Sequence, residues 1–217
     1  MLPTYIRYKC SEYKIASGNG FFKTVFDKGN YGEFITFNKL EKLKGHNKLM
    51  TNLYISKEDG STTEVDLIMI SETGIYVFES KNYSGWIFGD EMQKNWTQTL
   101  QNKKKNKFFN PIWQNKGHIT ALKFAVGIYD ENLYKSYIIF SERCTLKKIK
   151  VSSKNVKVMK RSSLLKHIKK DLRNSEKILN IEQIDGIYEK LGKYCLADDK
   201  IKKAHIDEIK LKKVNKF

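Results

Sequence analysis

The stretch STTEVDLIMISETGIYVFESKNY, from Ser61 to Tyr83, decides the fold of this chain. It contains two runs that are rich in apolar and β-branched residues, Thr62–Ile70 and Ile75–Lys81. The four residues Ser71–Gly74 between them are polar and end in a glycine, which is typical of a tight turn. The stretch therefore predicts a β-hairpin whose charged residues gather at its open end.

The turn determines which residues of the hairpin face each other. If Ile70 pairs with Ile75, then Asp66 lies directly opposite Glu79, with the two Cα atoms about 4.5–5.5 Å apart. Two carboxylates that face each other across a hydrophobic ladder repel and destabilise the sheet. Such a pair is tolerated where a ligand offsets the repulsion, and we expect a divalent cation here.

Lys81 and Glu64 extend this charged group. Lys81 lies two residues beyond Glu79 and therefore projects from the same face of the strand. The same register places Glu64 opposite Lys81. The two side chains could form a cross-strand ion pair, which contributes little if exposed. Alternatively, Glu64 could be a supplementary acid of the cation site.

The first strand of the hairpin is apolar on both faces. Val65, Leu67 and Met69 are expected to share one face, and Ile68 and Ile70 the other. A strand that is apolar on both faces is typical of a sheet covered on both sides. The pattern therefore predicts an α/β fold in which a mixed β-sheet is flanked by helices.

Other helices and strands follow from apolar spacing and capping residues. Apolar side chains at helical spacing predict a helix over Tyr31–Lys44, with Glu33 at the inner edge of its apolar face. Asn110 is a good N-cap and Pro111 a good first residue, so a second helix is expected to run to about Val126. Further strands are predicted at Asn52–Ser56, Trp86–Phe88, Asn95–Thr99, Ser136–Ser141 and Val156–Met159, and further helices at Ser162–Leu172, Ile181–Leu191 and Lys200–Lys213.

The order of the charged residues resembles that of a known nuclease superfamily. An Asp at the end of one strand, followed by Glu-x-Lys on the next, is the core motif of the PD-(D/E)XK nucleases. Here it reads Asp66 and then Glu79-Ser80-Lys81, although Val65 rather than Pro precedes Asp66. Further segments make the chain similar to the nuclease-related domain, NERD, over roughly residues 28–145: they are Gly32-Glu33, Tyr83-Ser84-Gly85-Trp86 and Asn110-Pro111-x-x-Gln114.

This resemblance implies a restriction-endonuclease-like core and a catalytic site. It implies that Asp66 and Glu79 bind Mg²⁺ or Mn²⁺, hard cations that prefer carboxylate oxygens. It also implies that Lys81 contacts the attacking water or the phosphate. Glu33 and Gln114 would support these residues. Helix stabilisation at Glu33 and an ordinary polar first turn at Gln114 are sufficient alternative explanations.

Other side chains near the motif have two interpretations each. His118 lies one turn after Gln114 on the same helix face, and we expect it to be structural or to face the substrate rather than to bind a metal. Tyr83, Trp86 and Trp96 could stack on bases, although aromatic side chains are more often part of a core.

The net charge indicates a polyanionic partner. The formal net charge is +17 and the pI is about 9.6, and such a field attracts nucleic acid. Only four of the 41 basic residues are Arg, so a composition inherited from an AT-rich genome is an equal explanation. The residues expected to bind nucleic acid form a lysine run, Lys103, Lys104, Lys105 and Lys107. A second basic group comprises Lys166, Lys169, Lys170 and Arg173.

A length of 217 residues without a Gly/Ser linker indicates one domain. We expect an N-terminal extension over residues 1–27, the NERD-like core over 28–145, and strands and helices that complete the same domain over 146–217. No apolar run is long enough to span a membrane, and the start MLPTYIRYKC lacks the apolar stretch of a secretory signal. Three widely spaced cysteines, Cys10, Cys144 and Cys195, predict reduced thiols and a cytoplasmic location.

These observations predict a metal-dependent nuclease that hydrolyses phosphodiester bonds, with DNA as the expected partner and no membrane partner. The alternative is a non-cleaving nucleic-acid-binding module with the same fold, because phosphate contacts give binding without catalysis. A third interpretation is a structural or interaction protein whose charge reflects genome composition. The set of Asp66, Glu79 and Lys81 favours the enzyme, since a pure binder has no need of it.

Overall fold

The structure is a computed structural model that describes residues 1–57, 60–195 and 207. Its larger sheet has five strands, in the order β1 (Lys48–Ser56), β2 (Thr62–Ser71), β3 (Gly74–Lys81), β7 (Tyr134–Phe140) and β9 (Val156–Lys160). β1, β2 and β3 are antiparallel neighbours, whereas β7 joins β3 in parallel and β9 joins β7 in parallel. The sheet is therefore mixed, as predicted.

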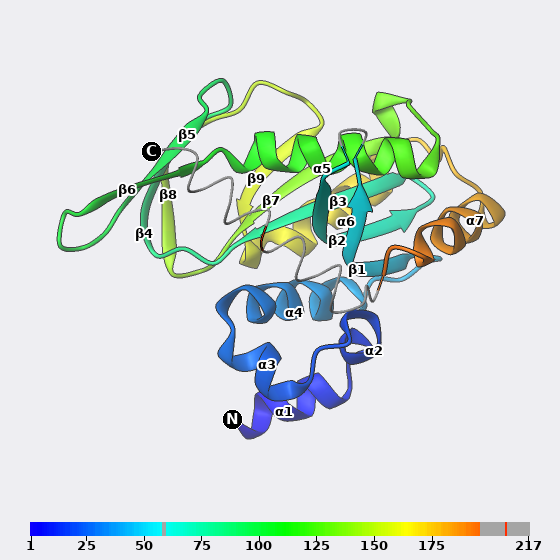
Figure 1. Cartoon of the computed structure of the whole chain (residues 1–217), viewed down its shortest axis with the longest axis horizontal. Coiled ribbons are helices and arrows are strands. Elements are labelled where there is room, and N and C mark those ends of the chain that lie inside the picture. Colours follow the sequence, from blue (N-terminus) through cyan, green and yellow to red (C-terminus); the bar gives the residue numbers. More distant parts are fainter. Residues whose placement is uncertain (58–59, 196–206, 208–217) are drawn as a thin grey trace.

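A smaller sheet of four strands continues from the larger one (Figure 1). Its order is β6 (Lys105–Phe109), β5 (Asn95–Thr99), β4 (Gly85–Asp90) and β8 (Cys144–Lys150). β3 and β7 run side by side in parallel, and after short breaks at residues 82–84 and 141–143 the chain pairs again in parallel as β4 and β8. These two breaks mark the place where the sheets separate.

Helices cover both faces of the larger sheet (Figure 1). α5 (Pro111–Val126) and α7 (Ile181–Gly192) cover one face, and α4 (Lys28–Leu40) and α6 (Leu164–Asn174) cover the other. The short helices α1 (Leu2–Lys9), α2 (Tyr13–Ser17) and α3 (Phe21–Phe26) pack on the α4 side, where Tyr8 and Tyr13 join the core. Short 3-10 helices at Glu131–Leu133 and Arg161–Ser163 precede β7 and α6.

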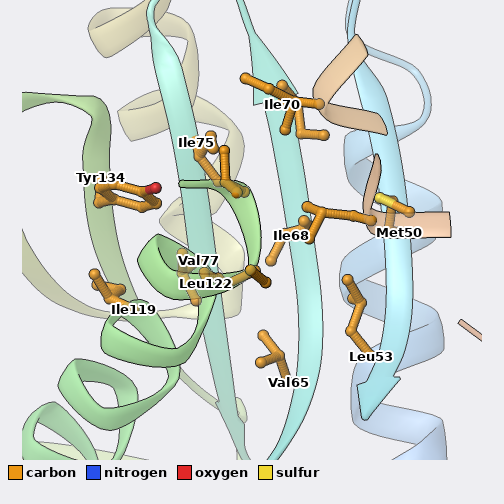
Figure 2. Packing of buried hydrophobic residues seen from close by; sticks show 14 of the residues in the cluster. Met50, Leu53, Val65, Ile68, Ile70, Ile75, Val77, Ile119, Leu122 and Tyr134 are labelled. Carbon is orange, nitrogen blue, oxygen red and sulfur yellow. The ribbon is translucent and has the colours of Figure 1, made fainter. Parts of the chain in front are cut away.

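β2 is buried on both faces, as its sequence predicts. Leu67 and Met69 pack on the α4 side, whereas Ile68 and Ile70 pack on the α5 side. Val65 packs in the same cluster as Ile68 and Ile70 (Figure 2). The prediction that Val65 shares a face with Leu67 and Met69 is therefore wrong.

An irregularity in β1 lies beside this change of face. The register of β1 with β2 places Asn52 opposite Asp66. Asn52 has a φ of 53°, a left-handed conformation that Asn adopts more readily than most residues do. The regular alternation of side chains is therefore interrupted beside Asp66, which is the first residue of the nuclease-like motif.

The predicted elements are largely confirmed, with shifted ends. The helix expected over Tyr31–Lys44 is α4, which begins earlier because the Asp27 side chain caps its first turn. α5 begins as predicted, since the Asn110 side chain accepts a hydrogen bond from a main-chain N–H of the first turn at 2.9 Å. α1, α2, α3, β6 and β8 were not expected from the sequence. The helix expected over Lys200–Lys213 lies outside the described residues, apart from Asp207.

The α/β class is confirmed, with two mixed sheets and flanking helices that are consistent with a restriction-endonuclease-like core. In the part of the chain that the structure describes, no helix is both long enough and apolar enough to cross a membrane. Cys10, Cys144 and Cys195 are all free thiols, as predicted.

Candidate active site

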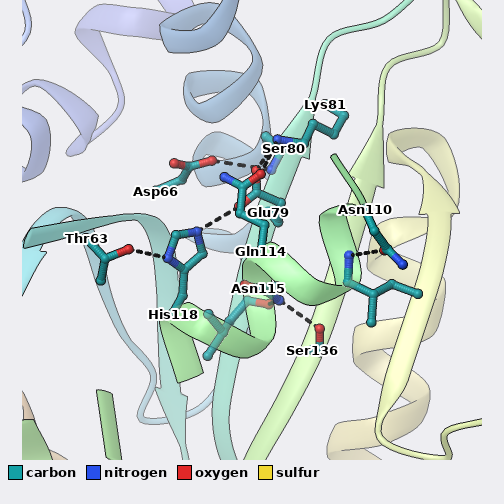
Figure 3. A network of polar contacts seen from close by, with 12 residues as sticks. Thr63, Asp66, Glu79, Ser80, Lys81, Asn110, Gln114, Asn115, His118 and Ser136 are labelled. Atoms are coloured by element: carbon teal, nitrogen blue, oxygen red, sulfur yellow. Dashed lines mark hydrogen bonds and ion pairs between the residues drawn. The ribbon is translucent and has the colours of Figure 1, made fainter. Parts of the chain in front are cut away.

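The hairpin has the register that the turn predicts. Ile70 pairs with Ile75, and this register carries Asp66 to the position opposite Glu79. The N–H of Ser80 points to Asp66 Oδ2 at 3.5 Å, so Asp66 stays close to β3 beyond the end of the ladder. The two carboxylates therefore lie together at the open end of the hairpin (Figure 3).

Lys81 links Glu79 to Gln114. Its Nζ donates to Glu79 Oε1 at 2.5 Å and to Gln114 Oε1 at 2.9 Å (Figure 3). Glu79 is only 1% exposed. Burial raises the pKa of Glu79, but attraction to Lys81 and a hydrogen bond from His118 outweigh burial and hold that pKa below its ordinary value. Burial likewise lowers the pKa of Lys81, but Glu79 outweighs burial and raises it, so both side chains are charged at neutral pH.

His118 contacts the other oxygen of Glu79, which the sequence did not predict. His118 Nε2 lies 3.1 Å from Glu79 Oε2, and Nδ1 lies 2.9 Å from the Thr63 hydroxyl (Figure 3). Because an ionised carboxylate only accepts hydrogen bonds, Nε2 is the donor, and Nδ1 of a neutral ring then accepts from Thr63. The spacing of Gln114 and His118 indicated a shared helix face. Only the packing of α5 over β3 shows that this face meets Glu79.

Four carboxylates form an acidic cluster at the end of the hairpin: Glu33, Glu64, Asp66 and Glu79. Burial, followed by the charges of Glu64 and Glu79, raises the pKa of Glu33 to about 8. Burial, followed by the charges of Glu79 and Glu33, raises the pKa of Asp66 well above its ordinary value. Lys81 opposes this shift at Asp66 but does not outweigh it. Negative charge on Glu33 and Asp66 is therefore unfavourable in the metal-free site.

Glu64 is held near the cluster by a residue of β1 rather than by Lys81. The Tyr54 hydroxyl donates to Glu64 Oε1 at 2.6 Å, and the two residues pair in the β1–β2 ladder. Of the two alternatives for Glu64, the ion pair with Lys81 is not formed among the described residues, and the β2–β3 ladder ends before it reaches them. Glu64 is therefore placed as a further acid near the site.

The chemistry of these donors suits Mg²⁺ or Mn²⁺. Mg²⁺ is commonly held by one or two carboxylates while several waters complete its coordination. Among residues 1–57, 60–195 and 207, no group of three or more His, Cys, Asp or Glu side chains is arranged to hold a metal ion. A cation held by Asp66 and Glu79 would therefore rely on water for its other ligands. It would also oppose the burial and the repulsion that raise the pKa of Asp66.

The lysine run lies in the smaller sheet rather than at the acidic cluster. Lys103 and Lys104 occupy the turn between β5 and β6, and Lys105 and Lys107 lie on β6, which is an edge strand. All of these side chains are exposed. Within the described structure, none forms a hydrogen bond or ion pair with the acidic cluster.

The aromatic residues near the motif differ in their exposure. Trp96 is 1% exposed and stacks on Phe140 in the core, so base stacking is wrong for this residue. Tyr83 is half-buried against Phe108. Trp86 is 51% exposed and is the aromatic side chain of the three whose position is compatible with stacking on a base.

Comparison with known proteins decides the family. The model of the nuclease-related domain, NERD, matches residues 28–141, more than half of the chain. The chain belongs to the NERD family. The NERD segment contains Glu33, the hairpin and Gln114, and so includes every residue of the site that the sequence predicts. An uncharacterized protein of Bacillus anthracis is 34% identical over 181 residues, which cover 82% of each chain. No solved structure matches this NERD protein.

Proposed function

We propose that this NERD protein is a metal-dependent nuclease of the PD-(D/E)XK type that hydrolyses phosphodiester bonds in DNA with Mg²⁺ or Mn²⁺. The observation that carries the proposal is the acidic cluster, in which Asp66 and Glu79 lie together beside Lys81. Crowded carboxylates destabilise a fold unless a ligand offsets their repulsion. The family supports a nuclease-related function, and a net charge of +17 suits a polyanionic substrate.

Asp66 and Glu79 would hold the metal in this proposal. When bound, the cation would polarise the scissile phosphate and lower the pKa of a water. Lys81 and His118 orient Glu79 through one oxygen each, and both oxygens keep lone pairs for a further ligand. Thr63 in turn orients His118. Partners of this kind fix the direction of a metal-binding side chain.

Lys81 would contact the attacking water or the phosphate. Its ammonium has three N–H donors, of which Glu79 and Gln114 take two. One donor therefore remains for a substrate oxygen. Because Glu79 and Gln114 come from β3 and α5, they hold the ammonium between two rigid elements, so Gln114 acts as a positioning residue.

Cleavage assays on plasmid DNA, single-stranded DNA and RNA test the proposal. We expect DNA to be cut with Mg²⁺ or Mn²⁺ and to stay intact with EDTA. Crystals soaked with Mn²⁺ give a second readout that does not depend on activity, and anomalous density is expected between Asp66 and Glu79. Intact substrates together with no density at that position would contradict the proposal.

One observation favours the alternative of a non-cleaving nucleic-acid-binding module. Both oxygens of Glu79 are already hydrogen-bonded within the protein, to Lys81 and to His118, which stabilises a metal-free arrangement. Such a module would bind DNA equally well with Mg²⁺ and with EDTA, and it would leave every substrate intact. The same assays therefore separate the two candidate functions.

A further inference from the structure

Arginine is rare in this chain, yet most of the arginine side chains line the same pocket. Four of the 41 basic residues are arginines. Three of them, Arg7, Arg143 and Arg161, line one pocket of about 470 Å³, and Lys28 adds a fourth basic side chain to its wall. The remaining arginine, Arg173, is exposed on α6. A composition that favours lysine does not explain why three arginines far apart in the sequence meet in one place.

The pocket lies at the carboxyl ends of three parallel strands. Its wall contains residues that directly follow β3, β7 and β9: Asn82, Ser141–Arg143 and Arg161 respectively. Crevices outside the carboxyl ends of parallel strands are common ligand sites in α/β folds, especially where neighbouring strands diverge. In this chain the divergence is the separation of the two sheets after β3 and β7.

Arg161 is a buried charge that forms no ion pair among the described residues. It is 7% exposed, and its Nε donates to the Thr36 hydroxyl at 3.1 Å. Its Nη2 has no hydrogen-bond partner among the described residues. Glu142, the acid whose charge acts on Arg161 most strongly, is already paired with Lys160 at 3.4 Å. A buried guanidinium with an unsatisfied N–H group and no ion pair is unfavourable, and a bound anion would offset this cost.

Arg143 is held at the pocket by the residue that follows Lys81. Arg143 Nη2 donates to the main-chain oxygen of Asn82 at 2.6 Å and to Asn82 Oδ1 at 3.0 Å. Asn82 Nδ2 donates in turn to the main-chain oxygen of Lys28 at 2.6 Å. These bonds tie the pocket wall to the end of β3, which carries Lys81 and Glu79.

We propose that this arginine pocket, formed by Arg7, Arg143 and Arg161 with Lys28, binds a phosphate group of the nucleic-acid substrate. A guanidinium presents N–H donors in a planar fork that matches two phosphate oxygens, and such charged pairs are stronger than neutral hydrogen bonds. A phosphate also supplies the negative charge that Arg161 lacks. The assignment rests on the proposed nucleic-acid substrate and adds a point at which its backbone is held.

The arginine pocket would set the position of the bound DNA strand relative to Lys81. Asn82 lines the pocket and directly follows Lys81, so a phosphate held in the pocket would lie next to the end of β3. A phosphate at the 5′ end of a strand and a phosphate within the strand have the same binding chemistry. The test therefore compares the two.

Binding without metal tests the pocket independently of cleavage. In EDTA, the affinity for a short single-stranded DNA is compared between wild type, Arg161→Leu and Arg173→Leu, which removes the same side chain and charge from an exposed site. Arg161→Leu is expected to bind at least about 10-fold more weakly, and Arg173→Leu less than about 3-fold more weakly. Equal losses of DNA affinity in the two variants would overturn the proposed phosphate pocket, even if wild type cuts DNA with Mg²⁺. A loss specific to Arg161→Leu supports the pocket even if no cleavage is found.

Melting temperature separates phosphate binding from a structural role of Arg161. Without ligand, Arg161→Leu should melt at or above the temperature of wild type, because it removes an unpaired buried charge. If the variant melts below wild type, Arg143→Gln replaces it as the test, since Arg143 is exposed. Its affinity must then fall more than that of Arg173→Gln, and equal affinities overturn the proposal.

Oligonucleotides with and without a 5′ phosphate distinguish the two sources of the phosphate. If the pocket takes a terminal phosphate, wild type should bind the phosphorylated strand at least about 10-fold more tightly, and Arg161→Leu should lose this preference. If it takes an internal phosphate, the two strands should bind equally and both should weaken in the variant. A preference that persists in Arg161→Leu overturns the assignment.

Discussion

The acidic cluster and the arginine pocket both lie at the end of β3, and they differ in the sign of the charge that each leaves unbalanced. In the cluster, Lys81 does not outweigh the burial and the repulsion that together raise the pKa of Asp66. In the pocket, Arg161 is buried and forms no ion pair within the described part of the chain, and Glu142 is paired with Lys160. If both proposals hold, the end of β3 carries adjacent sites for a cation and for a phosphate. These are the two partners that metal-dependent phosphodiester hydrolysis requires.

The largest expected effect tests the acidic cluster as the metal site. Asp66→Asn should lose at least about 100-fold in cleavage rate, because residues that merely orient a metal ligand already contribute 10–100-fold. Its affinity for DNA in EDTA should stay close to that of wild type, since the arginine pocket is intact. Asp130→Asn is the matched control, as its side chain caps a turn that Asn also caps. Full activity of Asp66→Asn would falsify the metal assignment.

The pH dependence of stability tests whether the carboxyl groups of the acidic cluster repel one another. The pKa of Glu33 is raised from 4.5 to about 8 in the folded state, so the folded protein binds a proton that the unfolded chain has released. The stability from this group is therefore complete below about pH 4.5 and is lost as the pH rises to about 8.

Urea unfolding in EDTA at several pH values measures this effect. Between pH 5 and 8, the loss of this contribution should lower the free energy of unfolding of wild type by about 3–4 kcal/mol. The free energy of unfolding of Glu33→Gln should fall less steeply with pH. That of Glu176→Gln, which replaces an exposed acid, should follow wild type. If Glu33→Gln and wild type have the same pH profile, Glu33 is not part of the repelling cluster.

The lysine run tests whether the basic side of the comparison extends to the smaller sheet. Affinity for duplex DNA should fall with salt, with a log–log slope of about −0.9 per phosphate contacted. Replacing Lys103, Lys104, Lys105 and Lys107 with Gln should flatten that slope and weaken binding about 10-fold at moderate salt. The control replaces Lys166, Lys169, Lys170 and Arg173 and so removes the same charge from α6. Equal effects of the two variants would show a diffuse field, and no salt dependence would support genome composition as the cause of the charge.

The smallest expected effect concerns thermal stability without metal. Burial and the charges of Glu79 and Glu33 raise the pKa of Asp66, so the folded state becomes less favourable as pH rises. Asp66→Asn removes this cost, and in EDTA at neutral pH it should melt about 2–4 °C above wild type. Mg²⁺ should stabilise wild type but not the variant. A lower melting temperature of Asp66→Asn, with no effect of Mg²⁺, would indicate that Asp66 simply pairs with Lys81.

The sequence by itself determined the parts of the molecule that depend on neighbouring residues. A tight turn fixes the register of a hairpin, so Asp66 could be placed opposite Glu79 without knowledge of the fold. Capping is also local, so Asn110 located the start of α5, and with it the shared face of Gln114 and His118. The order of these residues was sufficient to indicate the NERD family, which the comparison confirms.

Only the tertiary structure decided which distant residues meet. The contact of His118 with Glu79 depends on how α5 packs over β3, and the bond from Tyr54 to Glu64 depends on the pairing of β1 with β2. Arg7, Arg143 and Arg161 carry no common sequence pattern, and the pocket arises because β3, β7 and β9 end at the same edge of the sheet. Apolar periodicity shows which face of a helix or strand is buried, but it carries no information about the element that this face meets.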